Sequence, residues 1–384
     1  MTPPPYDSIP THDDMQRVKN ILLVGNWRSD TGYAWKMIER FWIAIARSFP
    51  DRQTFLCFPE VRTVNPAIPA AGIEVEEFAF DFRHPDVLAQ FCRDRDIELI
   101  YLTDRPYASS VYSKLRRSGV QRIIIHDHTP GLRTRPSGPK AMLKSIAART
   151  IGADAYIACS EQVLERFVTV GCLPRARCHL ARNGIDISQF PQPNPTIRTE
   201  LSVSPETVMI VSCSRLHPYK RVHDIVDAAA LLGDLDVHFI HIGDGPDLPS
   251  LQARIRKHGM ERRFTLLGAR TDVAQVLSGC DIAVHASSGE VGLCLAILEF
   301  MATGLAVAVT DEPSVSRVIE PGVTGITFTH GDISTLAESL RMLSTDPELR
   351  RRLGHAAREA VESRYHIEDT ITSVVDTVRS ALSS

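Results

Sequence analysis

Two cations stand close together after one of the apolar runs of this chain. Arg215 and Lys220 belong to the segment Ser214-Arg-Leu-His-Pro-Tyr-Lys220, which directly follows the apolar run Val208–Cys213. Arginine binds phosphate oxygens through parallel N–H donors, and lysine binds them as a point charge. A loop that fixes both cations at the end of a strand suits a diphosphate. A solvated basic loop would contain the same residues, so the pair alone does not decide between the two interpretations.

A second segment combines an acid with a predicted helix start. Glu290-Val-Gly292-Leu-Cys-Leu-Ala-Ile-Leu-Glu299 follows the run Asp281–His285, and we expect Gly292 to open an apolar helix that ends near Ala302. The backbone N–H groups at such a helix start bind phosphate oxygens, and the helix dipole strengthens the attraction. Glu299 would lie within the apolar helix, where a carboxylate needs a polar partner. Sugar hydroxyls and an arginine are both suitable partners.

Other motifs mark turns, and none indicates a metal. Gly243-Asp-Gly-Pro246 is a turn sequence between a predicted strand and a helix, and Asn183-Gly-Ile-Asp186 is a turn sequence near the linker. The pairs Asp94-Arg-Asp96 and Asp234-Leu-Asp236 immediately precede predicted strands, at the opposite edge of the sheet from the motifs above. His and Cys residues show no metal-ligand spacing. We therefore expect no metal and no cofactor, and the absence of G-x-G-x-x-G disfavours a dehydrogenase.

Apolar runs alternate with helical patterns along the chain, and this alternation predicts an α/β fold with two doubly wound parallel sheets. Ligands of such sheets bind beyond the carboxyl ends of the strands, so the motifs would share one edge. The predicted strands are Asn20–Gly25, Gln53–Phe58, Glu98–Thr103, Gln121–His126 and Asp154–Cys159 in the first series, and Val208–Cys213, Val237–Ile242, Phe264–Leu267, Asp281–His285 and Ala306–Val309 in the second.

The domain limits follow from a proline-rich segment. Phe190-Pro-Gln-Pro-Asn-Pro195 cannot continue a helix or a central strand, so we place the linker there. We expect a disordered leader at 1–20, a first domain at 21–188, a second domain at 189–364 and an amphipathic helix in 365–384, which we expect to pack back on the first domain.

Composition excludes several classes of protein. The net charge of −3 gives no argument for nucleic acid, and the eight cysteines form no C-x-x-C pair and mostly lie in apolar runs. Reduced buried thiols suit the cytoplasm. The first 20 residues lack the apolar core of a signal peptide, and no apolar stretch is long enough to span a bilayer.

Taken in order, these motifs resemble the family 4 retaining glycosyltransferases, which have the GT-B fold of two Rossmann-like domains facing a central cleft. Asn183–Asp186 matches N-G-[VI]-D, and Gly243–Pro246 matches G-x-G-P. Ser214–Lys220 resembles G-R-L-x-x-x-K, and Leu298-Glu-Phe-Met-Ala-Thr-Gly304 resembles L-E-A-M-A-x-G. The resemblance covers most of the chain and is sharp from Asn183 to about Thr310. One match alone is weak, but the ordered set at strand ends is strong.

The resemblance implies roles for the motif residues. The first domain would bind the acceptor and the second the donor. Arg215 and Lys220 would hold the donor diphosphate and stabilise charge on the leaving group, and Glu299 would bind the ribose hydroxyls. Glu290 would contact the transferred sugar. The other residues implied for the donor site are Gly243, Arg270 near the base, and the backbone N–H donors Gly292, Leu293 and Cys294.

The chain departs from the family pattern at two places. The family has E-x7-E, whereas eight residues separate Glu290 from Glu299, and Val291 takes the position of the usual acid. Either the loop holds an extra residue and Glu290 serves, which we favour because loops accept insertions, or that contact is missing. The glycine pair expected after the first strand is reduced to Gly32, which would lie in the acceptor site.

The family also places a histidine after the fourth or fifth strand of the first domain, near the sugar. His126 and His128 are both in register. We prefer His128 because a strand followed by His-Thr fits the sequence, and His126 paired with Asp127 is the rival.

Residues 128–153 contain five basic residues and no acid. Part of the segment is expected to be helical, with Met142, Leu143, Ile146 and Ala147 as its apolar side. The charge favours an anionic acceptor or an anionic membrane surface, and a solvated basic face is the alternative. The basic residues are Arg133, Arg135, Lys140, Lys144 and Arg149, of which we assign Arg133, Arg135 and Lys140 to the acceptor site.

The sequence thus predicts a retaining glycosyltransferase of surface polysaccharide or glycoconjugate synthesis. It would move a hexose-type sugar from a UDP- or GDP-linked donor to a glycan or a lipid-linked sugar, without metal. We expect it in the cytoplasm, with peripheral contact at the inner face of the membrane. The alternatives are a nucleotide-sugar epimerase or hydrolase of the same fold, which would need no acceptor, and a catalytically silent nucleotide-sugar-binding subunit.

Overall fold

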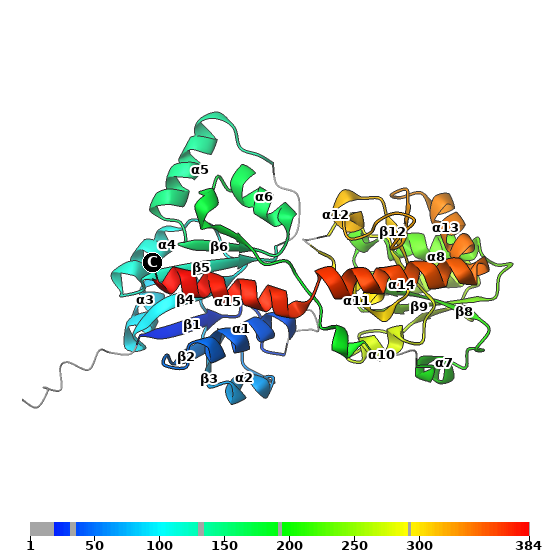
Figure 1. Ribbon diagram of the computed structural model, residues 1–384, viewed down its shortest axis with the longest axis horizontal. Coiled ribbons are helices and arrows are strands. Elements are labelled where there is room, and N and C mark those ends of the chain that lie inside the picture. Colours follow the sequence, from blue (N-terminus) through cyan, green and yellow to red (C-terminus); the bar gives the residue numbers. More distant parts are fainter. Residues whose placement is uncertain (1–18, 31–35, 130–133, 191–193, 291–292, 384) are drawn as a thin grey trace, which may run out of the picture. The chain divides into compact units, whose positions relative to one another are not determined.

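The computed structural model describes residues 19–30, 36–129, 134–190, 194–290 and 293–383. Within these ranges strands and helices alternate (Figure 1). The elements of the first half are β1 (Asn20–Val24), α1 (Lys36–Ser48), β2 (Thr54–Phe58), α2 (Ala67–Ala70), β3 (Ile73–Glu77), α3 (Pro85–Asp94), β4 (Ile97–Thr103), α4 (Ser110–Arg117), β5 (Arg122–Asp127), α5 (Gly138–Thr150), β6 (Ala155–Ala158), α6 (Glu161–Thr169) and β7 (Cys178–Leu180).

The second half continues the alternation and ends in three helices. Its elements are α7 (Thr196–Glu200), β8 (Val208–Cys213), α8 (Val222–Ala230), β9 (Val237–Ile242), α9 (Leu248–Lys257), β10 (Phe264–Leu266), α10 (Val273–Leu277), β11 (Ile282–His285), α11 (Leu295–Thr303), β12 (Ala306–Thr310), α12 (Pro313–Ser316), β13 (Ile326–Phe328), α13 (Ile333–Thr345), α14 (Pro347–Arg364) and α15 (Ile367–Ser383).

Two parallel sheets organise these elements. The first has the order β3-β2-β1-β4-β5-β6-β7 and the second the order β10-β9-β8-β11-β12-β13. In the second sheet the chain runs outward from β8 to β10 and then returns to place β11 beside β8. The direction of winding therefore reverses between β8 and β11. Such a switch point is where open parallel sheets bind ligands, at the carboxyl ends of the strands.

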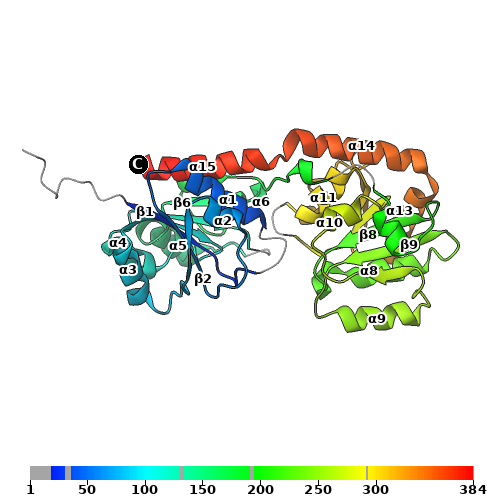
Figure 2. The same cartoon turned by 90° about the horizontal axis from the view of Figure 1, so that it is seen from below.

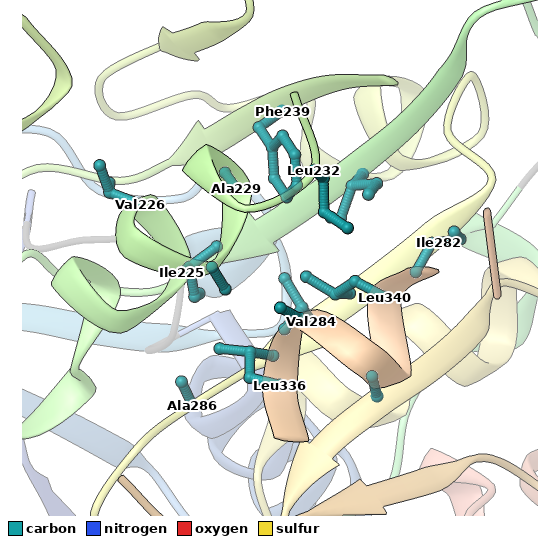
Figure 3. Close-up of a cluster of buried hydrophobic side chains, with 14 of the residues drawn as sticks. Ile225, Val226, Ala229, Leu232, Phe239, Ile282, Val284, Ala286, Leu336 and Leu340 are labelled. Carbon is teal, nitrogen blue, oxygen red and sulfur yellow. The ribbon is translucent and has the colours of Figure 1, made fainter. Parts of the chain in front are cut away.

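Apolar packing fixes the second sheet between helices. Helices α10 and α11 lie on one face and α8 and α9 on the other (Figure 2). Figure 3 shows Ile225 and Ala229 of α8 close to Val284 of β11 and to Leu336 and Leu340 of α13, all within one buried cluster. Each fully buried aliphatic side chain contributes roughly 1.5–3 kcal/mol. This core fixes β8 and β11, and thereby the points at which the loops after these strands begin.

The chain divides into two compact units, and the limits differ from the predicted domains. The first unit comprises 1–126, 142–156 and 375–384, and the second comprises 127–141 and 157–374. The last part of α15 belongs to the first unit, where Arg122 Nε donates to the carbonyl oxygen of Ala381 at 2.5 Å. The domain limits 21–188 and 189–364 stay a prediction.

Ten strands were expected close to where they occur, and three were not expected. β3, β7 and β13 each lie at the edge of a sheet. Edge strands need no continuous apolar run because one side faces no neighbouring strand, and β3 is largely exposed or half-buried. Residues 1–18 of the expected leader and 191–193 of the expected linker lie outside the described residues, and β1 begins at Asn20.

One predicted boundary is wrong. Helix α11, which contains Glu299, begins at Leu295 rather than at Gly292, since the backbone of Cys294 is extended (φ −69°, ψ 110°) and forms the N-cap. Among the described residues, no helix is long and apolar enough to cross a bilayer.

Candidate functional site

The cation-bearing loop after β8 is anchored at both ends. Leu216 is completely buried and fixes the middle of the loop in the core. The loop ends in a 3-10 turn, Pro218–Lys220, and the next residue, Arg221, has a left-handed backbone (φ 52°). Arg221 Nε donates to Oδ2 of Asp224 at 2.5 Å, which holds this strained residue in place. The position of Lys220 is therefore set by the backbone and does not depend on its flexible side chain alone.

Two glycines let the loop after β9 close on this cation-bearing loop. Gly243 has φ +137°, and a Cβ atom there would lie 1.9 Å from the carbonyl oxygen of Ser214. A Cβ atom at Gly245 would lie 2.3 Å from the carbonyl oxygen of Leu216. No side chain fits at either distance. Gly243 was predicted in the donor site. Because it has no side chain, the loop after β9 packs directly against the backbone of the cation-bearing loop.

At the switch point, Lys220, Glu290 and His285 form a charge network. The Lys220 ammonium contacts Oε1 of Glu290, and both side chains are only 10% exposed. Nε2 of the buried His285, the last residue of β11, lies 2.7 Å from the same oxygen. The sulfur of Cys294 lies 3.7 Å from His285 Nε2. One carboxylate therefore joins the loop after β8 to the end of β11.

The pKa values of the network reflect its mutual charges. Burial alone would raise the pKa of Glu290, but His285 and Lys220 outweigh burial and lower it to about 2. Burial lowers the pKa of His285, yet Cys294 and Glu290 together raise it to about 9. The pKa of Lys220 is also raised, because Glu290 outweighs desolvation. Near neutral pH Glu290 is thus a carboxylate that contacts the cationic side chains of Lys220 and His285.

The same place offers potential metal ligands. One ligand atom each from His285, Glu290 and Cys294 lie within 4.8 Å of one another, although their sequence spacing showed no metal pattern. This combination of nitrogen, oxygen and sulfur donors suits zinc. The Lys220 ammonium, however, already contacts the Glu290 carboxylate and would repel a divalent cation. We therefore interpret the set as a charge network.

Glu299 lies in the middle of α11. The residue is 7% exposed. Desolvation raises the pKa of the Cys213 thiol, and the charges of Glu299 and Cys294 raise it further, which places Glu299 near the last residue of β8. Among the predicted donor-site residues, the structure therefore gathers Lys220, Glu290, Cys294 and Glu299 at the carboxyl ends of two adjacent strands.

Arg215 differs from Lys220 in its surroundings. Its side chain is exposed, and its guanidinium lies 3.5 Å from the Tyr219 hydroxyl. The carbonyl oxygen of Tyr219 accepts a hydrogen bond from the backbone N–H of Ser288 at 2.7 Å, which ties the loops after β8 and β11 together. Arg215 is thus an exposed cation near the largely buried Lys220.

Arg270, which we expected near the base, is held by carboxylates. Its guanidinium donates to both oxygens of Asp272 at 2.8 Å and to Glu200 at 2.8 and 3.2 Å. The hydrogen bonds that it donates to both acids raise its pKa. An arginine with two carboxylate partners is well placed to order the loop after β10, and its charge is largely neutralised.

The two candidate histidines of the first sheet occupy different places. His126 is inside β5 and buried, with Nδ1 2.5 Å from the Tyr101 hydroxyl and its ring stacked on Phe41 at 5.4 Å. His128 directly follows β5, and desolvation lowers its pKa to about 4. A neutral imidazole just beyond a strand end fits a site residue better than one packed within the core.

Asp127 forms an ion pair with Arg166. Its Oδ2 accepts from Arg166 at 3.0 Å, and its Oδ1 accepts from the backbone and hydroxyl of Thr129 at 2.7 and 2.6 Å. This buried ion pair fixes the chain immediately after β5. The expected pairing of His126 with Asp127 stays a prediction.

Some predicted residues fall outside this description. Gly32, Arg133 and Gly292 lie outside the described residues. Arg135 and Lys140 are exposed, the first just before α5 and the second in its first turn. Three contributors to the site, His285, Tyr219 and Ser314, were missed. A polar residue at the last position of β11 was the available signal for His285, and Ser314 Oγ accepts from the backbone N–H of Glu290 at 2.9 Å across 24 residues.

The architecture matches solved glycosyltransferases along nearly its whole length. A glycosyltransferase from Rickettsia africae aligns with a TM-score of 0.78 and 15% identity, over 95% of this chain and 99% of that one. Anabaena HepE, solved in complex with UDP, aligns with a TM-score of 0.75 and 22% identity, over 94% of this chain and all of the other. Together with the two sheets and the switch-point site, this likeness defines a protein with the GT-B fold.

Two family models divide the chain. Residues 39–189 match glycosyltransferase family 4, and residues 194–360 match glycosyl transferases group 1. The N-acetyl-alpha-D-glucosaminyl L-malate synthase of Bacillus anthracis is 29% identical over 177 residues, 46% of each chain. The aligned segments span about half the length of such curated relatives. The chain belongs to the family 4 glycosyltransferases.

Proposed function

We propose that this glycosyltransferase takes its sugar from a nucleoside diphosphate sugar and passes it, with retention of anomeric configuration, to a glycan or lipid-linked sugar. The observation that carries the proposal is the nearly buried Lys220 ammonium, fixed by Glu290 at the switch point of the second sheet. A cation that is fixed and shielded from water interacts strongly with concentrated negative charge, such as the charge of a diphosphate. The UDP complex of Anabaena HepE supports this choice of ligand.

In this proposal each polar group at the switch point has a task. Lys220 and Arg215 bind the diphosphate, and the backbone at the start of α11 adds N–H donors and the positive end of a helix dipole. Glu299 accepts hydrogen bonds from the ribose hydroxyls. Glu290 contacts both Lys220 and His285 and keeps them in place. It would thereby link the groups that bind the sugar to the groups that bind the diphosphate.

The reaction follows from these tasks. The bond between the anomeric carbon and the diphosphate oxygen breaks, and its electron pair leaves with the diphosphate. Lys220 and Arg215 stabilise the charge that develops there, which lowers the barrier through an oxocarbenium-like transition state. The acceptor hydroxyl then bonds to the same face of the anomeric carbon, and its proton passes to the departing diphosphate oxygen. We expect no covalent glycosyl-enzyme.

The first experiment measures thermal unfolding with UDP, GDP and ADP and with their sugar conjugates, without added metal. Selective binding to the folded chain raises the melting temperature by mass action. A shift with one nucleotide family identifies the base. The absence of any shift would refute the diphosphate site.

A second experiment separates the reaction classes. With the binding donor in hand, proton NMR follows the anomeric configuration of the product formed with glycan and lipid-linked acceptors. Retention with acceptor-dependent turnover supports the proposal. Donor consumption without acceptor would indicate an epimerase or hydrolase, and trapping of a covalent glycosyl-enzyme would overturn the proposed mechanism.

A further inference from the structure

Helix α5 turns its large apolar side chains away from the protein (Figure 1 labels the helix). Met142 and Leu143 are each 67% exposed and Ile146 is 47% exposed. A helix that packs only on its own protein buries its large apolar residues and exposes its small ones. In α5 the arrangement is inverted. The more protected side, at the helical spacing i, i+4 and i+7, consists of the small residues Ala141, Ser145 and Ala148.

The clustering of these residues is not matched elsewhere in the described part of the chain. Eight large apolar residues are exposed there, and three of them belong to α5. The other five are separated from one another by 19 or more residues (Val87, Val168, Leu231, Val323 and Met342). Single exposed apolar residues are ordinary, whereas a group on one short helix indicates a surface that something covers.

Basic residues flank the exposed apolar side of α5. At about 100° per residue, Met142, Ile146 and Leu143 cover one arc of the helix. Arg149 lies at one border of this arc, and Lys140 and Lys144 lie beyond the other. All three basic side chains are exposed, and Arg135 is exposed just before the helix. No acid occurs from 128 to 153, so the segment carries a net positive charge.

We propose that α5 lies in the headgroup region of an anionic lipid bilayer and docks the enzyme there. Met142, Leu143 and Ile146 would enter the boundary between headgroups and acyl chains. The long stems of Lys140 and Lys144 allow their ammonium groups to stay at the level of the lipid phosphates. A second copy of this chain is a poorer occupant, because a two-fold interface would bring the same basic residues together.

This surface stands on exposure and charge alone, and it does not rest on the donor site. Docking through α5 narrows the proposed acceptor class towards lipid-linked sugars. Such acceptors are confined to the bilayer, so docking would concentrate the enzyme on its substrate. The donor-binding measurements and the vesicle measurements therefore succeed or fail separately.

The test is co-sedimentation of the full chain with vesicles of phosphatidylcholine, with and without phosphatidylglycerol. We expect binding to the vesicles with phosphatidylglycerol and weak binding to phosphatidylcholine alone. The variant M142S/L143S/I146S and the variant K140Q/K144Q/R149Q should each bind at least tenfold more weakly, and wild-type binding should decrease as salt rises. Met342→Ser, which changes a similarly exposed apolar residue on α13, should bind like wild type.

All the substituted side chains are exposed, so melting temperatures should stay close to wild type and exclude misfolding as a cause. Equal binding to both kinds of vesicle, or to neither, would overturn the proposal. So would unchanged binding by the apolar variant. Concentration-dependent dimerisation that M142S/L143S/I146S abolishes would show that a second copy covers this face instead, and analytical ultracentrifugation detects it.

Discussion

Nε2 of His285 lies 2.7 Å from Oε1 of Glu290, and the Lys220 ammonium contacts the same carboxylate oxygen. One acid thus contacts two cations, one in the loop after β8 and one at the end of β11. Glu290 was expected to contact the transferred sugar, and its position in the network gives it a second task. The carboxylate orients the lysine that we assign to the diphosphate.

Two roles of Glu290 can be tested separately, namely contact with the sugar and positioning of Lys220. We expect Glu290→Gln to weaken binding of the sugar-free nucleoside diphosphate several-fold, because Lys220 loses its anchor. Turnover should fall about 100-fold or more, as it should for Lys220→Met. Isothermal titration and steady-state rates provide both numbers.

Ser288→Ala is the matched control, since the side chain is exposed in the same loop and only its backbone N–H contacts Tyr219. It should behave like wild type. Unchanged nucleotide affinity in Glu290→Gln, combined with lost turnover, would show that Glu290 acts on the sugar alone.

We expect the free energy of unfolding to decrease at alkaline pH, because His285 loses its proton there. The pKa of this histidine is about 9 in the fold and 6.5 in the reference state. Its protonated form therefore contributes fully below pH 6.5, and the contribution disappears as pH rises through about 9. Glu290 has the opposite sign. Its contribution is present above about pH 4.5 and is lost as pH falls through about 2.

Urea unfolding of wild type and His285→Asn between pH 6 and pH 10 isolates this effect, because other groups titrate in both proteins. We expect the stability advantage of wild type to shrink by about 1–3 kcal/mol over this range. A constant difference between the two proteins would mean that His285 is not charged at neutral pH.

Gly243→Ala should damage both stability and donor binding. The new Cβ atom would clash with the carbonyl oxygen of Ser214 in a left-handed backbone conformation. Backbone strain and displacement of the cation-bearing loop should cost about 2–4 kcal/mol. Nucleotide affinity should fall with it, since this loop carries Lys220.

Gly259→Ala provides the control for backbone strain. Gly259 also has a positive φ, but its surroundings leave space for a Cβ atom. We expect a loss of roughly 1 kcal/mol and normal nucleotide affinity. Equal effects of both substitutions would show that the contact with Ser214 is unimportant.

We expect substitutions of His126 and His128 to have different effects on stability and turnover. His126→Gln removes a buried ring from between Phe41 and Tyr101, so it should lower the melting temperature by several degrees. His128→Gln should lower turnover with a smaller change in stability, because His128 lies beyond the strand. Thermal unfolding and rates on both variants test this, and the reverse pattern would assign His126 to the site.

Much of the scaffold could be predicted from local sequence. The limits of β8 and β9 were predicted to the residue, because continuous apolar runs bounded by turn sequences are typical of strands buried on both faces. The cations of the loop after β8, and Glu290 after β11, followed from their places after strands, and Glu299 was identified as an acid within an apolar helix. The edge strands β3, β7 and β13 escaped prediction, because a strand with one open edge needs little apolar sequence.

What the sequence by itself determined was which residues stand at the carboxyl ends of the strands, since strand order along the chain and apolar periodicity are local properties. Only the tertiary structure decided which of them meet. Lys220 and Glu290 are 70 residues apart, and they touch because the chain returns from β10 to place β11 beside β8. His285 and Cys294 join them through side-chain directions at a strand end and a helix N-cap. Residue spacing along the chain does not fix those directions, so the charge network could not be predicted from sequence.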